Sequence, residues 1–260
     1  MFRHHGPSRS ERENTLLAAY LACVGGYVNS AGFLALGTFT SHVTGSVARF
    51  ASQLASRQLT AAGAMLAMVC AFYMGAFLAS LIVESRTFSR APIAYGVALS
   101  FEAILLAAFA GIESGRSALA TGLRGADALF LCMSMGVQNS LVTRLSGAVV
   151  RTTHLTGVVT DLGIETAQWL SGWRGSRATQ RELARASGRP SREPHVLSKL
   201  RLHLTVFLTF TLGAVLGCAL TPHWRQLSML FPSAVVAVGA CYAFASARTA
   251  PLRTGSWRRS

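Results

Sequence analysis

The sequence predicts an all-α fold, a polytopic transmembrane helix bundle with an internal two-fold repeat. Of the 260 residues, 51% are hydrophobic and only 13% are charged, whereas a soluble domain carries about 25% charged residues. The apolar residues gather in continuous runs long enough to cross a bilayer. Short motifs in the first half of the chain recur in the same order in the second half.

Six apolar runs have the length of a membrane-crossing helix, which requires about 20 residues. They are residues 15–37, 61–83, 92–112, 126–143, 202–221 and 227–247. The runs are continuous rather than alternating, and they are too long for the strands of a membrane barrel. The sequence therefore predicts six full helical spans.

The spans differ in polarity. The run at residues 15–37 is too long for the apolar core of a signal peptide, so we expect a retained first span. Residues 61–83 hold no charged residue, whereas Glu102 is embedded in the third run. The fourth run fits less well because it contains Gln138 and Asn139.

Two shorter segments are too polar to face lipid. Residues 41–54 contain Arg49, and residues 152–170 contain Asp161 and Glu165. Each segment fits a half-helix, a re-entrant segment or a full span shielded by its neighbours.

The net charge of +14 is concentrated between the apolar runs, as the positive-inside rule predicts for cytoplasmic segments. We therefore expect a bacterial inner membrane protein with both termini and a basic loop in the cytoplasm, where the loop can contact anionic lipid. No groove motif with interleaved aromatic residues accompanies the charge, so nucleic acid is not an expected partner. The predicted divisions are a cytoplasmic tail (1–14), a first membrane repeat (15–112), a linker (113–125), a second membrane repeat (126–247) with the basic loop (171–201), and a cytoplasmic tail (248–260).

Several motifs recur in the two halves, so that each half holds one span, one H-x-T-G segment and two further spans. The matched pairs are Gly26–Ser30 with Gly136–Ser140, Ser41–Gly45 with Thr153–Gly157, and Phe72–Leu78 with Phe210–Leu216. If the H-x-T-G segments do not cross the membrane, the three spans of each half make the halves inverted, as in many secondary transporters. If they do cross, each half has four spans and the halves are parallel. We favour the inverted arrangement because the charged side chains of Arg49 and Asp161 would be costly to bury in a full span.

The H-x-T-G segments are the most informative feature for function. Ser41 and Thr153 stand directly before His42 and His154, as in a helix N-cap. A helix that begins inside the membrane points free N–H groups and a partial positive charge into the protein, which suits a polar or anionic solute. The candidate solute-binding residues are Asn29, His42, Thr44, Asn139, Arg151, Thr152, Thr153, His154 and Thr156. The alternative is structural, because Gly, Ser and Thr permit close helix packing and a His can cap a helix.

Four charged residues lie in or beside apolar segments, where charge is costly unless it is paired or reaches water. They are Arg49, Glu102, Asp161 and Glu165. Arg49 and Asp161 occupy equivalent positions in the repeat, so we predict that they form an ion pair across the pseudo-twofold axis. Glu102 and Glu165 are candidates for a proton relay. The two equivalent asparagines in the candidate list are expected to hydrogen-bond between helices rather than to a ligand.

Catalytic and metal-binding signatures are missing from the sequence. It has no G-x-S-x-G, no phosphate-binding loop, and no H-E-x-x-H or H-x-x-x-H. The five cysteines stand singly in apolar runs and are expected to be small buried hydrophobic residues. We therefore expect neither an enzyme, nor a metal site, nor a bound cofactor.

The repeated motifs resemble the two signatures of the YoaK-like family of bacterial multipass membrane proteins of unknown function. The matching segments are Gly26–Phe33 with Ser41–Gly45, and Gly136–Asn139 with Val150–Gly157 and Thr160–Gly163. Ser46 departs from the family, where Asn often follows the Thr-Gly, so no ligand role is carried over to that position. The resemblance, which covers about residues 15–247, implies a membrane location and the repeat but no substrate or catalytic residue.

We consider three possible functions. We favour a secondary transporter for a small polar or anionic solute, because of the repeat, the polar interrupted helices and the buried charges. A non-catalytic scaffold or sensor that uses the basic loop is the alternative. A membrane-embedded enzyme is less favoured, because no reactive constellation is present. The sequence names neither the solute nor an oligomeric state.

Overall fold

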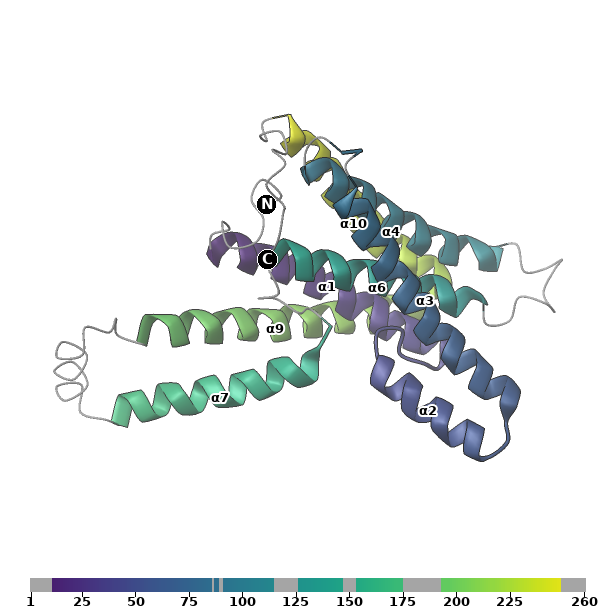
Figure 1. The fold of residues 1–260 in the computed structure, drawn as a ribbon, viewed down its shortest axis with the longest axis horizontal. Coiled ribbons are helices and arrows are strands. Elements are labelled where there is room, and N and C mark those ends of the chain that lie inside the picture. The colour runs from purple at the N-terminus through teal and green to yellow at the C-terminus, as the bar shows by residue number, and fades with distance from the viewer. Residues whose placement is uncertain are drawn as a thin grey trace.

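The computed structural model describes residues 11–85, 87–88, 91–114, 126–146, 153–174 and 193–248, and every regular element in these ranges is a helix (Figure 1). The elements are α1 (Glu11–Leu36), α2 (Val43–Ala55), α3 (Leu59–Glu84), α4 (Ala91–Ser114), α6 (Ala126–Ser146), α7 (Leu155–Arg174), α9 (Glu193–Trp224), the 3-10 helix η2 (Arg225–Met229) and α10 (Leu230–Ala247). The predicted all-α helix bundle is confirmed.

The helices follow the apolar runs, with one difference at the basic loop. We predicted a loop over residues 171–201, but α7 continues to Arg174 and α9 begins at Glu193. Both ends of that segment are therefore helical. The physical reason is that α9 packs against α7, so its first turns gain a partner before the apolar run begins.

By length and hydropathy, four segments of the described chain qualify as membrane spans. They are residues 12–36, 59–84, 91–111 and 196–247, the last of which contains both α9 and α10. The polar residues of α6 keep it below this threshold. α6 packs against α1, α3 and α4, and Leu131, Met135 and Leu141 on it are fully buried. A helix shielded in this way needs no apolar outer face.

The outer helices carry the apolar surface. The exposed large apolar side chains of α3, α9 and α10 include Leu66, Tyr73, Phe77, Leu208, Leu212, Val215 and Val238. Only 28% of the spanning window of α3 is buried, against 61% for α1 and for α4. Continuous apolar surface of this kind would be a liability in water, whereas in a bilayer it is the face that contacts lipid.

Two reciprocal helix crossings join the halves. α1 packs along α9, and α6 packs along α3. A Cβ atom on Gly26 would fall on the Phe210 carbonyl oxygen, and one on Gly136 would fall on the Phe72 carbonyl oxygen. Glycine at these positions lets the two backbones of each crossing touch.

Glycines on the partner helices complete each crossing. Gly213 of α9 lies against the Cys23 carbonyl, and Gly75 of α3 lies against the Met133 carbonyl. The two crossings therefore map onto one another under the sequence repeat. The same order of buried and half-buried positions also recurs over residues 21–33 and 131–143, so the repeated sequence is a repeat of packing.

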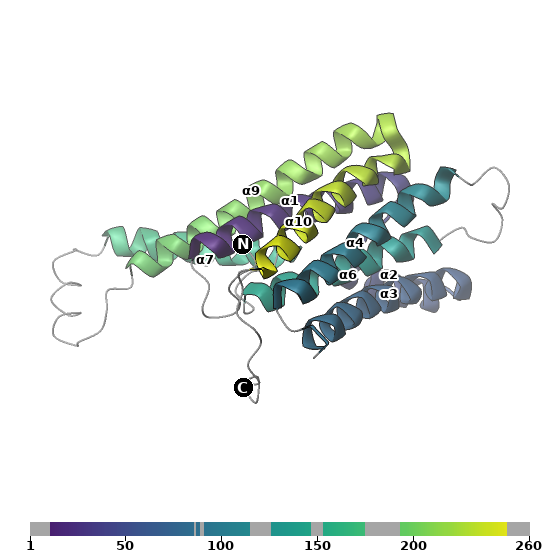
Figure 2. The same cartoon turned by 90° about the horizontal axis from the view of Figure 1, so that it is seen from above.

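The repeat is inverted (Figures 1 and 2). α1, α4 and α9 run one way along the molecule, and their counterparts α6, α10 and α3 run the other way. Each H-x-T-G helix continues in the direction of the helix before it, and the next helix turns back beside it, so that α2 pairs with α3 and α7 with α9. α2 has 13 residues, a length of about 20 Å, which is too short for a hydrocarbon core of about 30 Å. α7 has 20 residues, a length of about 30 Å, so in the second half it is the direction of α7, which continues that of α6, that fits three spans.

We predict that Gly26→Ala and Gly136→Ala each destabilise the protein, because the added methyl group must push two backbones apart. Overpacking of this kind costs about 1–3 kcal/mol. Gly63→Ala on α3 is the matched control, because open space surrounds that position and the exchange favours a helix by about 0.5–1 kcal/mol. Thermal unfolding in detergent measures the difference, and equal melting temperatures for all three variants would contradict the crossing.

Candidate functional site

Each H-x-T-G helix is tied to the helix before it through an asparagine. In the first half, the Ser41 backbone N–H and hydroxyl donate to Asn29 Oδ1 at 3.3 and 3.0 Å. In the second half, Thr153 Oγ1 donates to Asn139 Oδ1 at 2.5 Å. Asn139 Nδ2 donates in turn to the Met135 carbonyl at 2.7 Å. The two asparagines thus fix the turn between successive helices.

The prediction that Ser41 is the N-cap of the first H-x-T-G helix is wrong. α2 begins at Val43, so His42 holds the N-cap position, and its side chain caps nothing. The Ser41 hydroxyl is engaged with Asn29 instead. The start of α2 therefore keeps backbone N–H groups that its N-cap side chain does not satisfy.

The spacing of the H-x-T-G motif has a local cause. A Cβ atom on the glycine three residues after His42 or His154 would lie against Nδ1 of that imidazole. Each ring therefore lies over the first turn of its own helix, and the glycine makes room for it. His42, His154, Thr44 and Thr156 are all exposed. The motif thus gives each helix start an exposed imidazole and an exposed hydroxyl.

The starts of α2 and α7 lie near the middle of the molecule, and the two helices run from there toward opposite ends (Figures 1 and 2). Both starts contact α1, because Thr40 Cγ2 faces Gly32 and Thr153 Cγ2 faces Gly25. Seven residues separate these two glycines, which is about 10 Å along a helix. Two helix N-termini therefore reach the same stretch of α1 from opposite directions.

Two buried polar atoms near these starts have no hydrogen-bond partner within the described part of the chain. They are Oγ1 of Thr40, which is 3% exposed, and Oε1 of Gln138, which is fully buried. Gln138 Nε2 donates to the Leu21 carbonyl at 2.5 Å, and its side chain faces Gly25 beside Thr153. An unpaired buried polar group costs about 1–3 kcal/mol. A bound solute or water would supply the missing partners.

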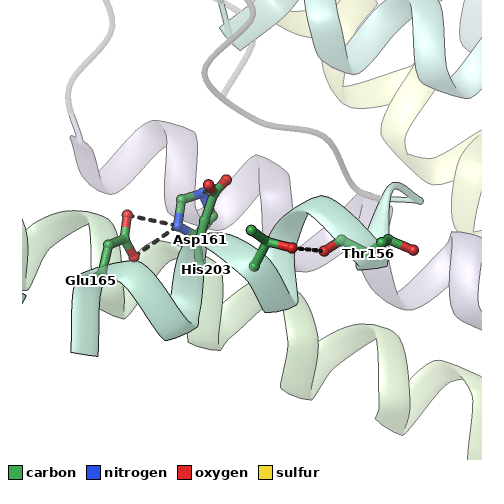
Figure 3. Close-up of polar contacts among 5 residues, drawn as sticks. Thr156, Asp161, Glu165 and His203 are labelled. Carbon is green, nitrogen blue, oxygen red and sulfur yellow. Dashed lines mark hydrogen bonds and ion pairs between the residues drawn. The ribbon is translucent and has the colours of Figure 1, made fainter. Parts of the chain in front are cut away.

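A second polar group joins α7 to α9 (Figure 3). His203 Nδ1 lies 3.0 and 2.9 Å from the two carboxylate oxygens of Glu165. His203 Nε2 lies 3.8 Å from Asp161 Oδ2. We call these three residues the α7–α9 cluster.

The predicted ion pair between Arg49 and Asp161 is wrong. Asp161 contacts His203, and the ion pairs found among the described residues do not include Arg49. The two residues stand on α2 and α7, which run to opposite ends of the molecule (Figure 1). The reason is that α2 packs on α3 and α7 packs on α9, so equivalent positions diverge from the pseudo-twofold axis.

Glu102 lies apart from the α7–α9 cluster. Its side chain on α4 is fully buried, and neither carboxyl oxygen has a partner in the described ranges. α4 packs against α10, α6 and α3, so the carboxyl group lies among spanning helices. An ionised carboxylate without a partner would be costly there.

Two of the candidate solute-binding residues, Arg151 and Thr152, lie outside the described residues, as does the basic loop from residue 175 to 192.

In the described ranges, no three His, Cys, Asp or Glu side chains are grouped as a metal site requires.

The cysteines are all free, and their predicted burial is largely wrong. Cys132 is buried and Cys23 is half-buried, but Cys70, Cys218 and Cys241 are exposed. The exposed three stand on α3, α9 and α10, the helices that carry the apolar surface. A small apolar side chain is equally suited to lipid and to a protein interior.

Three residues of the site were missed by sequence reasoning. In the sequence, Gln138 is a single polar residue in a span, and its repeat counterpart is Val28, so the repeat does not mark it as a site residue. His203 is separated from the α7 carboxylates by the basic loop, and only helix packing brings them together. Thr40 is the repeat counterpart of Thr152, a signal that was available.

Comparison with known proteins shows the family. The family described as "Protein of unknown function (DUF1275)" matches residues 17–242, so the chain belongs to it. The chain is also 30% identical over 151 residues to the UPF0700 transmembrane protein YoaK of Bacillus subtilis (strain 168). That alignment covers 57% of this chain and 65% of the relative, slightly less than two thirds of its length. No solved structure matches the chain. The resemblance drawn from the repeated motifs is confirmed, and the protein is a membrane protein of a family of unknown function.

We predict that Glu102→Gln unfolds at the same temperature as the wild-type protein or higher, because a neutral amide keeps the volume of the side chain without its charge. Glu102→Lys should destabilise by about 3 kcal/mol or more, since it places an unpaired charge in the core. Thermal unfolding in detergent compares the two. A large loss of stability in Glu102→Gln would show that the carboxylate is ionised and paired.

Proposed function

We propose that this member of the DUF1275 family is a secondary transporter, not an enzyme, for a small polar or anionic solute. The observation that carries the proposal is the approach of two helix N-termini to one stretch of α1 near the middle of the molecule, beside buried polar atoms without partners. Secondary transporters with inverted repeats place their substrate sites at the interface of the repeats, where interrupted helices end.

The chemistry of this site favours a solute with negatively charged or strongly accepting oxygens. Free backbone N–H groups and a partial positive charge at a helix start attract an anion. The unpaired Thr40 hydroxyl can donate to such an oxygen, whereas the unpaired Gln138 Oε1 accepts and would bind a donor group of the solute. The exposed imidazoles of His42 and His154 lie on the first turns of the same two helices, one from each half.

Access from both sides of the membrane is supported by the two hairpins. The α2–α3 and α7–α9 hairpins extend toward opposite ends of the molecule (Figure 2). Each hairpin belongs to a different half and begins at the group formed by Thr40, His42, Gln138 and His154, which we call the central site. Movement of one hairpin against the glycine crossings would open the site at one end only, which is the requirement for alternating access.

We place the protein in the inner membrane of a bacterium, with both termini and the basic loop in the cytoplasm. The support is charge, because eight basic residues lie between Arg174 and Arg201, and positive loops stay on the cytoplasmic side. Lys199 and Arg201 extend this charge along the first turns of α9.

The second candidate is a non-catalytic scaffold or sensor. The same basic loop favours it, because clustered arginines attract anionic lipid headgroups. A scaffold needs no unpaired polar atoms at its centre and would bind anionic vesicles without moving a solute. Uptake measurements therefore separate the two functions.

We predict that proteoliposomes containing the protein take up at least one solute from a panel of small anions and polar metabolites. Gln138→Val should reduce uptake by about tenfold, because it removes the oxygen that accepts from a donor group of the solute, and one such hydrogen bond contributes about 1.5 kcal/mol. Valine is the residue at the equivalent position of the first half, Val28, so the fold should tolerate this replacement. His154→Ala should reduce uptake as well.

The control is Thr211→Val, which changes an exposed hydroxyl on the outer face of α9 and should leave uptake unchanged. Binding of anionic vesicles without uptake of any solute would contradict transport and favour the scaffold. Normal uptake by folded Gln138→Val and His154→Ala would remove the central site from the mechanism.

A further inference from the structure

The α7–α9 cluster is a close group of titratable side chains outside the central site. Asp161 and Glu165 are four residues apart on α7, so they stand on the same face of the helix. His203 of α9 lies between them, with Nδ1 within 3.0 Å of both Glu165 oxygens and Nε2 within 3.8 Å of Asp161 (Figure 3). Each imidazole nitrogen therefore faces a different carboxylate.

The cluster extends from the interior to the surface. The Glu165 side chain is 8% exposed, that of His203 17%, and that of Asp161 52%. Asp161 thus offers an accessible carboxylate, while Glu165 holds the inner nitrogen of the ring. This order gives a proton a path from the surface at Asp161 to the imidazole of His203, which lies between two carboxylates.

The inverted repeat contains its own control for this cluster. The equivalent positions of the α2–α3 hairpin hold Arg49, Gln53 and Met65. That hairpin packs in the same way as the α7–α9 hairpin without any carboxylate or imidazole at these positions. The cluster is therefore not required to hold such a hairpin together, and its chemistry needs another explanation.

Other charged groups of the described residues lie on the helices that carry or contact His203. Its own helix carries Lys199 and Arg201 just before it. α1 packs along α9 in the same direction, and the charged residues on its first turn are Glu11, Arg12 and Glu13. The contacts of Gly213 with the Cys23 carbonyl and of Gly217 with the Tyr27 carbonyl set the register of α1 on α9, and this register brings Glu13 near the level of His203. The α7 carboxylates contact the imidazole directly.

We propose that the α7–α9 cluster binds the proton that couples solute movement to a proton gradient. The proton adds to whichever ring nitrogen of neutral His203 carries no hydrogen and gives an imidazolium between the two carboxylates. Release of the proton restores the neutral ring. Bound, it joins α7 to α9 by two charge-assisted contacts. Released, it leaves two carboxylates on one face of α7 that repel each other.

Coupling follows from where α7 begins. Its first residues belong to the central solute site, and Asp161 and Glu165 lie on the second and third turns of the same helix. A proton that fastens or frees α7 against α9 therefore moves the N-terminus that faces the solute. This inference rests on the proposed transport function, and it adds the coupling ion to it.

The test uses the full-length protein in proteoliposomes with a solute that the wild-type protein exchanges. Two assays are compared: solute exchange without a pH gradient, and accumulation of the solute driven by a pH gradient. Glu165→Gln and His203→Met replace cluster residues with their counterparts from the first half. We expect both variants to exchange solute within about twofold of wild type and to lose gradient-driven accumulation by about tenfold or more.

Glu84→Gln is the matched control, because Glu84 forms an exposed ion pair with Arg144 outside the cluster and should keep accumulation. Accumulation that persists in Glu165→Gln and His203→Met overturns the proton site. Wild-type exchange without gradient-driven accumulation also overturns it, while leaving the transport function intact. A wild-type protein that exchanges no solute overturns both proposals.

Discussion

The contact of glycine with a backbone carbonyl at two reciprocal crossings determines how the rest of the protein is arranged. Gly26 brings α1 onto α9, and Gly136 brings α6 onto α3. Each half thereby gives its first helix to the third helix of the other half. The first helices become the shielded core, and the third helices keep an outer face for lipid. The H-x-T-G helices then pack in hairpins that extend toward the two ends, while the starts of these helices contact α1.

This arrangement explains why polar residues gather where they do. α1 and α6 are covered by other helices, so Gln138 and the two asparagines can stand on them without touching lipid. The asparagines bind the turns that begin the H-x-T-G helices. Beside those turns, a buried amide oxygen and a buried hydroxyl have no hydrogen-bond partner among the residues that the structure describes. Covering by neighbours, rather than apolar composition, is what allows a polar site at this depth.

The positions of the helices and the repeat were predictable from the sequence, because spanning helices require long apolar runs and duplicated contacts require the same small residues. The partners of the helices were not. The repeat identifies Gly26 and Gly136 as equivalent residues. It does not indicate that each of them contacts a helix of the other half. The pairing of Asp161 with His203 instead of Arg49 follows from that choice of partners. The N-cap was wrong because the Ser41 hydroxyl binds a residue on the preceding helix.

The two halves share a fold but differ in chemistry. At four equivalent positions the second half holds an amide, two carboxylates and an imidazole, while the first half holds apolar or neutral residues or a cation. The differing pairs are Gln138 and Val28, Asp161 and Arg49, Glu165 and Gln53, and His203 and Met65. In the transport mechanism that we propose, symmetric packing would permit movement of either hairpin, and the asymmetric side chains would give that movement a direction.

The inverted arrangement of the two halves is tested most directly by accessibility labelling of single cysteines at Ser56 and Ser171, in a variant whose five native cysteines are replaced. Ser56 follows α2 and Ser171 lies near the end of α7, and both side chains are exposed. A membrane-impermeant maleimide is applied to right-side-out and to inverted vesicles. Inverted halves of three spans place the two positions on opposite sides, so each cysteine reacts in a different vesicle preparation. Reaction of both in the same preparation would mean that the H-x-T-G helices cross the membrane and that the halves are parallel.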